Sequence, residues 1–136
     1  MNRFRKNTLR FILLCFSFVC FPAMACQSDM PSIQHEDEYS LSYQFSDNPI
    51  ELGKHFSISI WVCKDDRLID IDRLRADAIM PSHGHGMNYD PEITSLELGK
   101  FKANGLLFHM PGDWQIIFDV FLGKKKYTFK DNYQLQ

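Results

Sequence analysis

The stretch DWQIIFDVFL, residues 113–122, alternates large apolar residues with more polar ones. Successive side chains of an extended strand point to opposite faces of a sheet, so a period of two places every second residue on one face. The apolar positions here are Trp114, Ile116, Phe118, Val120 and Leu122. The stretch therefore predicts a strand that buries one face in a hydrophobic core.

Working outward from this strand, other stretches show the same period or the composition of strands. YSLSYQF at residues 39–45 and HFSISIWV at residues 55–62 alternate most clearly, and LRADAIM at residues 74–80 alternates alanine and larger apolar residues with charged ones. Weaker strand patterns follow at residues 92–98, 101–110 and 125–130. Turns are expected around Gly99 and Gly123, because glycine adopts the backbone angles that tight turns need.

The Asn104-Gly105 pair has two interpretations. Asn-Gly is a typical two-residue hairpin turn, but a hairpin here would leave only three residues on each side. A continuous strand with a β-bulge at Gly105 is preferred. No helical period of useful length occurs, and about seven short strands in about 100 residues predict an all-β, immunoglobulin-like antiparallel β-sandwich. A small β-barrel is the alternative fold.

The first 25 residues have the features of a cleaved signal peptide. A basic leader precedes FILLCFSFVCF, an apolar run of eleven residues, and small residues follow at Ala23 and Ala25. An uncleaved anchor is the alternative, but the run is shorter than the roughly 20 residues needed to span a bilayer. The expected organisation is a signal peptide at residues 1–25, an extended leader at 26–38 and a β-sandwich at 39–136. This predicts a periplasmic or otherwise exported protein.

The charge of the expected mature chain argues against nucleic acid as a partner. The sequence has 15 Lys and Arg against 17 Asp and Glu, and four of the basic residues lie in the signal peptide. The remaining 11 and 17 give a formal net charge of 11 minus 17, or −6. Such a chain has no excess of positive charge for binding phosphate backbones. No later segment is apolar and long enough to cross a membrane.

Two of the four cysteines, Cys26 and Cys63, remain after cleavage. An even pair in an oxidising compartment predicts a disulfide bond between them. The alternative is that Cys26 is the lipidated first residue of a lipoprotein. The third residue before it is Ala23, where lipoprotein signals usually carry leucine, and this favours the disulfide.

Two loop motifs carry side chains that bind soft metals. MPSHGHGM, residues 80–87, places His83, His85 and Met87 at alternate positions, which would share one face of an extended chain. FHMPGDW, residues 108–114, adds His109 and Met110, of which one would join the site from a second loop. Imidazole together with thioether suits copper, and Cu(I) in particular, better than Ca²⁺ or Mg²⁺. The alternative is that both motifs are only tight loops whose histidines satisfy backbone groups.

No catalytic arrangement stands out. There is no G-x-S-x-G motif, the two mature cysteines are expected to be oxidised, and the carboxylates are spread along polar strand faces. The sequence therefore favours a protein that is not an enzyme.

The two motifs, MPSHGHGM and then GLLFHMPGDW, resemble the YtkA-like family of exported bacterial domains. The matching positions run from Leu74 to Val120, about half of the expected mature chain. The resemblance implies an immunoglobulin-like sandwich outside the cytoplasm and suggests copper handling. Compared with small periplasmic copper carriers that begin with histidine, this chain has Cys26 at the expected mature N-terminus.

Two functional hypotheses follow from these observations. The first is a periplasmic copper-binding carrier or metallochaperone whose ligands are drawn from His83, His85, Met87, His109 and Met110. The second is a non-metal interaction module that docks onto another envelope protein. An extracytoplasmic enzyme is a third and weaker hypothesis.

Overall fold

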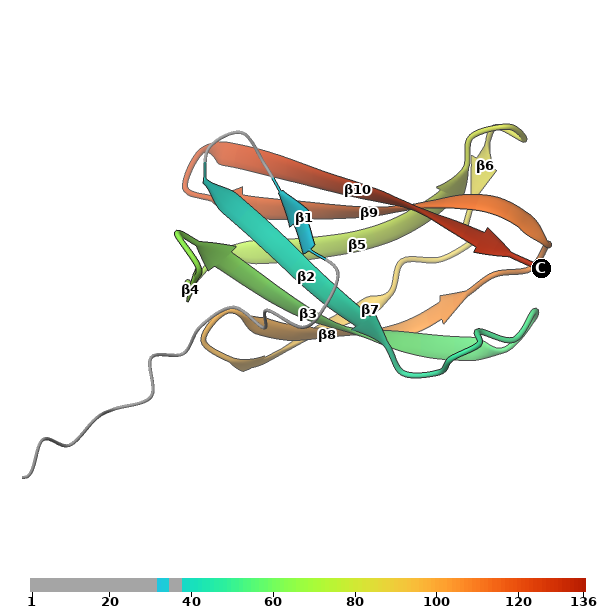
Figure 1. Cartoon of the computed structure of the whole chain (residues 1–136), viewed down its shortest axis with the longest axis horizontal. Helices are drawn as coiled ribbons and strands as arrows, with labels where there is room; N and C mark the ends of the chain where they lie inside the picture. The colour runs from blue at the N-terminus through green and yellow to red at the C-terminus, as the bar shows by residue number, and fades with distance from the viewer. Residues whose placement is uncertain (1–31, 35–37) are drawn as a thin grey trace, which may run out of the picture.

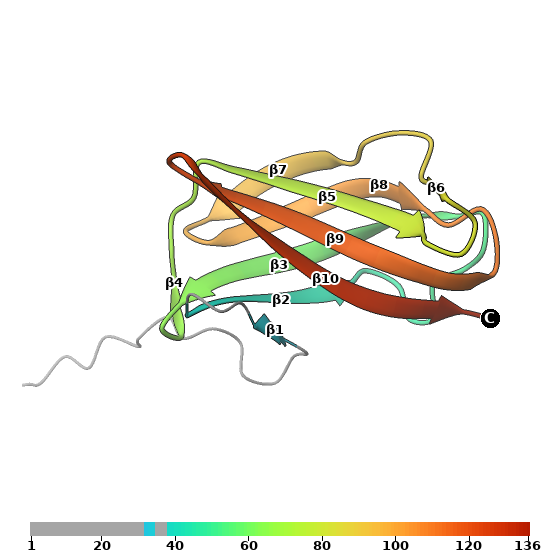
Figure 2. The same ribbon diagram turned by 90° about the horizontal axis from the view of Figure 1, so that it is seen from above.

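A computed structural model of the chain describes residues 32–34 and 38–136. Every regular element in this part of the chain is a β-strand, and the strands form two antiparallel sheets packed face to face (Figures 1 and 2). The first sheet has the order β1-β2-β3-β8-β7, with β4 paired to β3, and the second has the order β10-β9-β5-β6. The strands are β1 (Ser32–Gln34), β2 (Tyr39–Phe45), β3 (His55–Lys64), β4 (Arg67–Leu68), β5 (Arg73–Met80), β6 (His85–Gly86), β7 (Glu92–Glu97), β8 (Lys100–Leu107), β9 (Gly112–Leu122) and β10 (Lys125–Leu135).

The topology of the seven longest strands is that of an immunoglobulin domain of the constant type. Counted along the chain, the first, second, fifth and fourth of them form one sheet in that order, and the third, sixth and seventh form the other. The immunoglobulin-like sandwich expected from the strand pattern is therefore confirmed.

The core lies between the two sheets and consists of the residues that the period of two selects. In β9 the side chains of Trp114, Ile116, Phe118 and Val120 are all buried, while Leu122 is only partly buried. The other strands contribute in the same way, through Leu41 and Tyr43 of β2, Phe56, Ile58, Ile60 and Val62 of β3, and Leu74, Ala76, Ala78 and Met80 of β5. In these four strands the sequence pattern thus predicts which face points inward.

The connections follow the turn chemistry of the sequence. Gly105 has a φ of +86° and is the extra residue at a register shift in the pairing of β3 with β8, so the bulge interpretation is confirmed and the hairpin interpretation is wrong. Gly99 and Gly123 also have positive φ, in the β7–β8 and β9–β10 turns. β8 ends at Leu107, before the expected end at Met110, and β10 continues to Leu135, five residues beyond the expected end at Lys130.

The described part of the leader includes a strand that the sequence pattern did not indicate. β1 pairs antiparallel with β2, Ser32 opposite Ser42, and so extends the edge of the first sheet. The expected signal peptide at residues 1–25 and Cys26 lie outside the described residues. Cys63 in β3 is fully buried and is a disulfide-bonded cysteine. Its pairing with Cys26 stays a prediction. Within residues 32–34 and 38–136 there is no helix long and apolar enough to cross a membrane.

Tyr43 of β2 links the first sheet to β10 of the second sheet. Its hydroxyl donates a hydrogen bond of 2.8 Å to the carboxylate of Asp131 in β10. Burial, followed by the hydrogen bond to Asp131 and the charge of that carboxylate, raises the pKa of Tyr43 above its ordinary value of 10. The neutral hydroxyl is therefore the form that the fold stabilises.

The Tyr43→Phe variant is expected to lose about 1–2 kcal/mol of unfolding free energy at neutral pH, because it removes a hydrogen bond to a charged acceptor. The folded pKa of Tyr43 lies above the unfolded one, so this contribution is fully present below about pH 10 and is lost as the pH rises further. Urea unfolding of both proteins at pH 7, 9 and 11 measures this, with Tyr89→Phe as the control. A difference that is absent at pH 7, or that grows with alkalinity, would contradict this assignment.

Candidate functional site

The first histidine motif forms a hairpin at the end of β5. β6 folds back on β5, so that His85 lies opposite Met80 and Gly86 lies opposite Ile79. The turn between them is closed by the carbonyl of Met80, which accepts hydrogen bonds from the backbone N–H groups of His83 (3.1 Å) and Gly84 (3.0 Å). The backbone N–H of Met87 then donates to the carbonyl of Ala78. This hairpin fixes the backbone that carries both histidines.

Both glycines of the motif have a structural role, and the two roles differ. Gly84 has a φ of +67° with open space around it, so the turn needs a residue that tolerates the left-handed region. At Gly86 φ is not positive, but a β-carbon there would lie 2.9 Å from the carbonyl oxygen of Ala78. Gly84 therefore allows the turn, and Gly86 allows close pairing of β6 with β5.

The second motif reaches the same end of the sandwich from the other sheet. β8 ends at Leu107, and the chain crosses through Phe108 and His109 to β9, which begins at Gly112. Figures 1 and 2 show the β5–β6 hairpin and the β8–β9 connection at one end of the molecule, together with the C-terminus. The expected meeting of the two motifs at one end of the sandwich is what the structure has.

The imidazole rings of three predicted ligands lie side by side at this end. The ring centres of His83 and His85 are 5.7 Å apart, and those of His85 and His109 are 5.2 Å apart. His85 is partly buried, and the rings of His83 and His109 are exposed. His85 is thus the centre of the group, with one neighbour from its own hairpin and one from the other loop.

A buried tryptophan supports this histidine group. Trp114 is 1% exposed and contacts His85 and His109 at ring-centre distances of 6.4 and 5.4 Å, with both rings nearly perpendicular to the indole. Phe108 stacks on the same indole at 4.6 Å. The indole N–H donates a 3.0 Å hydrogen bond to the carbonyl of Met110, which fixes the β8–β9 connection. Trp114 therefore joins the core to both loops.

The three methionines of the motifs have different environments. Met80 is fully buried, as its position on the inward face of β5 predicts, and its terminal methyl packs close to Gly112. Met87 and Met110 are partly buried and pack against the core. Since a thioether ligand must reach solvent or a neighbouring loop, these two remain the available sulfur donors.

The spacing of the histidines suits a shared ion, although their present arrangement does not converge on one point. Two imidazoles whose nitrogens bind one metal at about 2.0 Å have ring centres roughly 5 Å apart, close to the two distances observed. No group of three or more His, Cys, Asp or Glu side chains within residues 32–34 and 38–136 is arranged to hold a metal ion. Both outer rings are exposed, so the side chains of His83 and His109 have room to adopt other rotamers.

The expected backbone conformation of the first motif was wrong. The pattern assumed an extended chain in which His83, His85 and Met87 share a face, but residues 81–84 form a turn. His83 reaches His85 because the hairpin curls back, not because of strand parity. Proline at position 81 and glycine at position 84 favour such a turn, and this signal was present in the sequence.

A fourth histidine lies at the same end and was not among the predicted ligands. His55, the first residue of β3, packs its ring on Tyr89 at 5.7 Å, and its Nδ1 lies 3.3 Å from the carbonyl oxygen of Gly105. These contacts give His55 a role in holding the loop that carries Tyr89. It is the natural control for experiments on the other three histidines.

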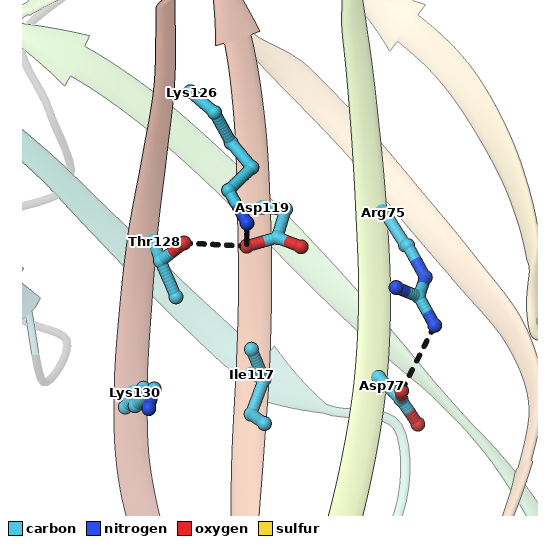
Figure 3. Close-up of a pocket in the computed structure, with 7 residues that line it drawn as sticks. All are labelled: Arg75, Asp77, Ile117, Asp119, Lys126, Thr128 and Lys130. Atoms are coloured by element: carbon cyan, nitrogen blue, oxygen red, sulfur yellow. Dashed lines mark hydrogen bonds and ion pairs between the residues drawn. The ribbon is translucent and has the colours of Figure 1, made fainter.

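Two surface depressions lie on the sheet that contains β5. One, of about 330 Å³, lies on the β5–β6 hairpin beside Pro81, Gly84 and His85. The other, of about 440 Å³, lies on the outer face of the β10-β9-β5 sheet (Figure 3). There Asp119 accepts a hydrogen bond from Thr128 at 2.6 Å, and Arg75 pairs with Asp77 at 3.1 Å. Asp119 also pairs with Lys126 at 3.6 Å, so each of the two carboxylates in the second depression has a cationic partner, which disfavours a bound metal ion.

Comparison with known proteins identifies the fold and not the family. The sequence matches no protein-family profile and none of the curated proteins. A DUF4426 family protein from Pseudomonas aeruginosa has a similar structure, with a TM-score of 0.57 and 12% identity over 77% of this chain and 96% of its own. A DUF4785 family protein from Legionella pneumophila has a TM-score of 0.52 and 15% identity over 73% of this chain. This chain spans only 28% of the length of the Legionella protein. Both likenesses are to all-β bacterial domains.

Proposed function

We propose that this protein is a periplasmic copper-binding carrier or metallochaperone, with copper as its cargo. The observation that carries the proposal is the grouping of His83, His85 and His109 at one end of the sandwich, at ring-centre distances of 5.7 and 5.2 Å. The resemblance of the two motifs to the YtkA-like family adds to it.

The donor set favours copper over other metals. Three imidazoles and the partly buried thioethers of Met87 and Met110 are soft or borderline donors, and none of these five residues carries a carboxylate. Such a set suits Cu(I), whereas Ca²⁺ and Mg²⁺ prefer oxygen. Because His83 and His109 are exposed, the cargo would be bound at the surface and could pass directly to a partner. A carrier needs this kind of access, whereas a purely structural site is closed.

Metal analysis of the exported protein tests the proposal. The mature chain is purified from the periplasm and offered Cu(I), Cu(II) and Zn²⁺ separately, and the metal retained after desalting is counted by elemental analysis. We expect one copper per chain and little zinc. Retention of no metal by a folded chain would leave the interaction module as the better hypothesis.

A further inference from the structure

A groove with aromatic lining lies between β2 of one sheet and β10 of the other. Its volume is about 330 Å³, and the residues that line it are Tyr43, Gln44, Phe45, Asn48, Asp131 and Tyr133. None of them belongs to the histidine group or to the two loop motifs.

Three of the six residues that line this groove are aromatic, and the ring of Phe45 stands at a steep angle to the other two. The ring of Phe45 stands edge-on to Tyr43 at 5.4 Å and 78°, and to Tyr133 at 5.0 Å and 66°. Phe45 and Tyr133 are partly exposed and pack against the core on their other sides. The faces of aromatic rings carry negative electrostatic potential, so a cation in the groove would gain from contact with the rings that line it.

The charged lining of the groove is negative. It contains the carboxylate of Asp131 and no Lys or Arg, and within the described residues no salt bridge of Asp131 is found. The carboxylate does have hydrogen bonds, because Oδ2 accepts from the Tyr43 hydroxyl and Oδ1 accepts from the backbone N–H of Asn132. A cation in the groove would therefore gain charge attraction but few new hydrogen bonds.

We propose that this groove binds a small soluble organic cation with a trimethylammonium head. A quaternary ammonium has no N–H to satisfy and presents methyl groups to the rings, which matches aromatic rings beside a single carboxylate. A guanidinium would bring five N–H donors, more than the acceptor sites that remain on the Asp131 carboxylate, since each of its oxygens already accepts one hydrogen bond. The inference is independent of copper binding at the histidine end.

Titration of the full mature chain with choline tests this inference. Calorimetry and the NMR signals of the Phe45 and Tyr133 rings report the binding. Saturable binding is expected, and the uncharged carbon analogue 3,3-dimethyl-1-butanol should bind at least about 10-fold more weakly. Phe45→Leu and Asp131→Asn should each weaken choline binding about 5-fold or more. Phe121→Leu and Asp77→Asn, on the outer face of the β10-β9-β5-β6 sheet and away from the groove, are matched controls and should bind as the wild type does.

Three results would overturn the inference: equal binding of choline and its neutral analogue, no binding of choline, or equal loss in the Phe45 and Phe121 variants. Circular dichroism checks that each variant is folded, and Phe45→Tyr, which keeps a ring, should retain binding. If the chain co-sedimented with phosphatidylcholine vesicles, the ligand of the groove would be a lipid surface and not a small soluble cation. Choline binding should be unchanged in a His83→Ala, His85→Ala double variant, which separates this site from the proposed copper site.

Discussion

Replacing both His83 and His85 by alanine is expected to weaken copper binding by more than about 100-fold. Loss of a partner outside the coordination shell already costs about 10–100-fold in typical metal sites, and this change removes two of the proposed ligands. His85 is the central ring of the group, so without it His109 has no imidazole neighbour from the β5–β6 hairpin. Competition against a chelator of known copper affinity measures the change.

The fold should survive this double substitution. His83 is exposed, His85 is partly exposed, and their backbone hydrogen bonds to Met80 and across the hairpin do not depend on the side chains. The matched control is His55→Ala, which removes a histidine at the same end that packs on Tyr89. If His55→Ala and the double variant lost copper to the same extent, the ligand assignment would be wrong.

Trp114→Ala is expected to lower the unfolding free energy by about 3–5 kcal/mol, the usual cost of removing a buried large aromatic side chain. The indole is 1% exposed, stacks on Phe108 and donates a hydrogen bond to the carbonyl of Met110. Since small domains have only about 5–15 kcal/mol of stability in total, the melting temperature should fall by roughly 15–30 °C.

The second tryptophan supplies the control for this prediction. Trp61 lies in β3 on the face opposite to the core and is only partly buried. Its replacement by alanine should cost far less, about 1 kcal/mol. Thermal unfolding of the two variants side by side separates a specific role of Trp114 from a general effect of losing an indole. Similar costs for the two would contradict the place of Trp114 in the core.

The sandwich and its core were predictable because a half-buried strand has a simple period. Alternation at residues 39–45, 55–62, 74–80 and 113–122 indicates the inward faces, and the burial of Ile58 and Phe118 follows from it. The bulge at Gly105 was predictable for a similar local reason, since only the bulge leaves strands of useful length. These signals come from residues close together in the sequence.

The histidine end was predictable only in part. The motifs indicated which residue types gather there, but the β5–β6 hairpin, not strand parity, brings His83 to His85. The contact of His55 with Tyr89 joins residues 34 positions apart, and no local pattern encodes it. The β1 strand was missed because its three residues form a strand by pairing with β2, and a local sequence pattern does not show such pairing.

The measurement that tests the central claim most directly is the response of the histidine ring signals to Cu(I) in the wild-type chain. Nitrogen-15 NMR of the imidazoles follows His55, His83, His85 and His109 in one sample, so the first serves as an internal control. We predict that the signals of His83, His85 and His109 shift and saturate together at one equivalent, and that the signal of His55 stays in place. Unchanged signals of the three, or a shift confined to His55, would contradict the proposal that these loops hold copper.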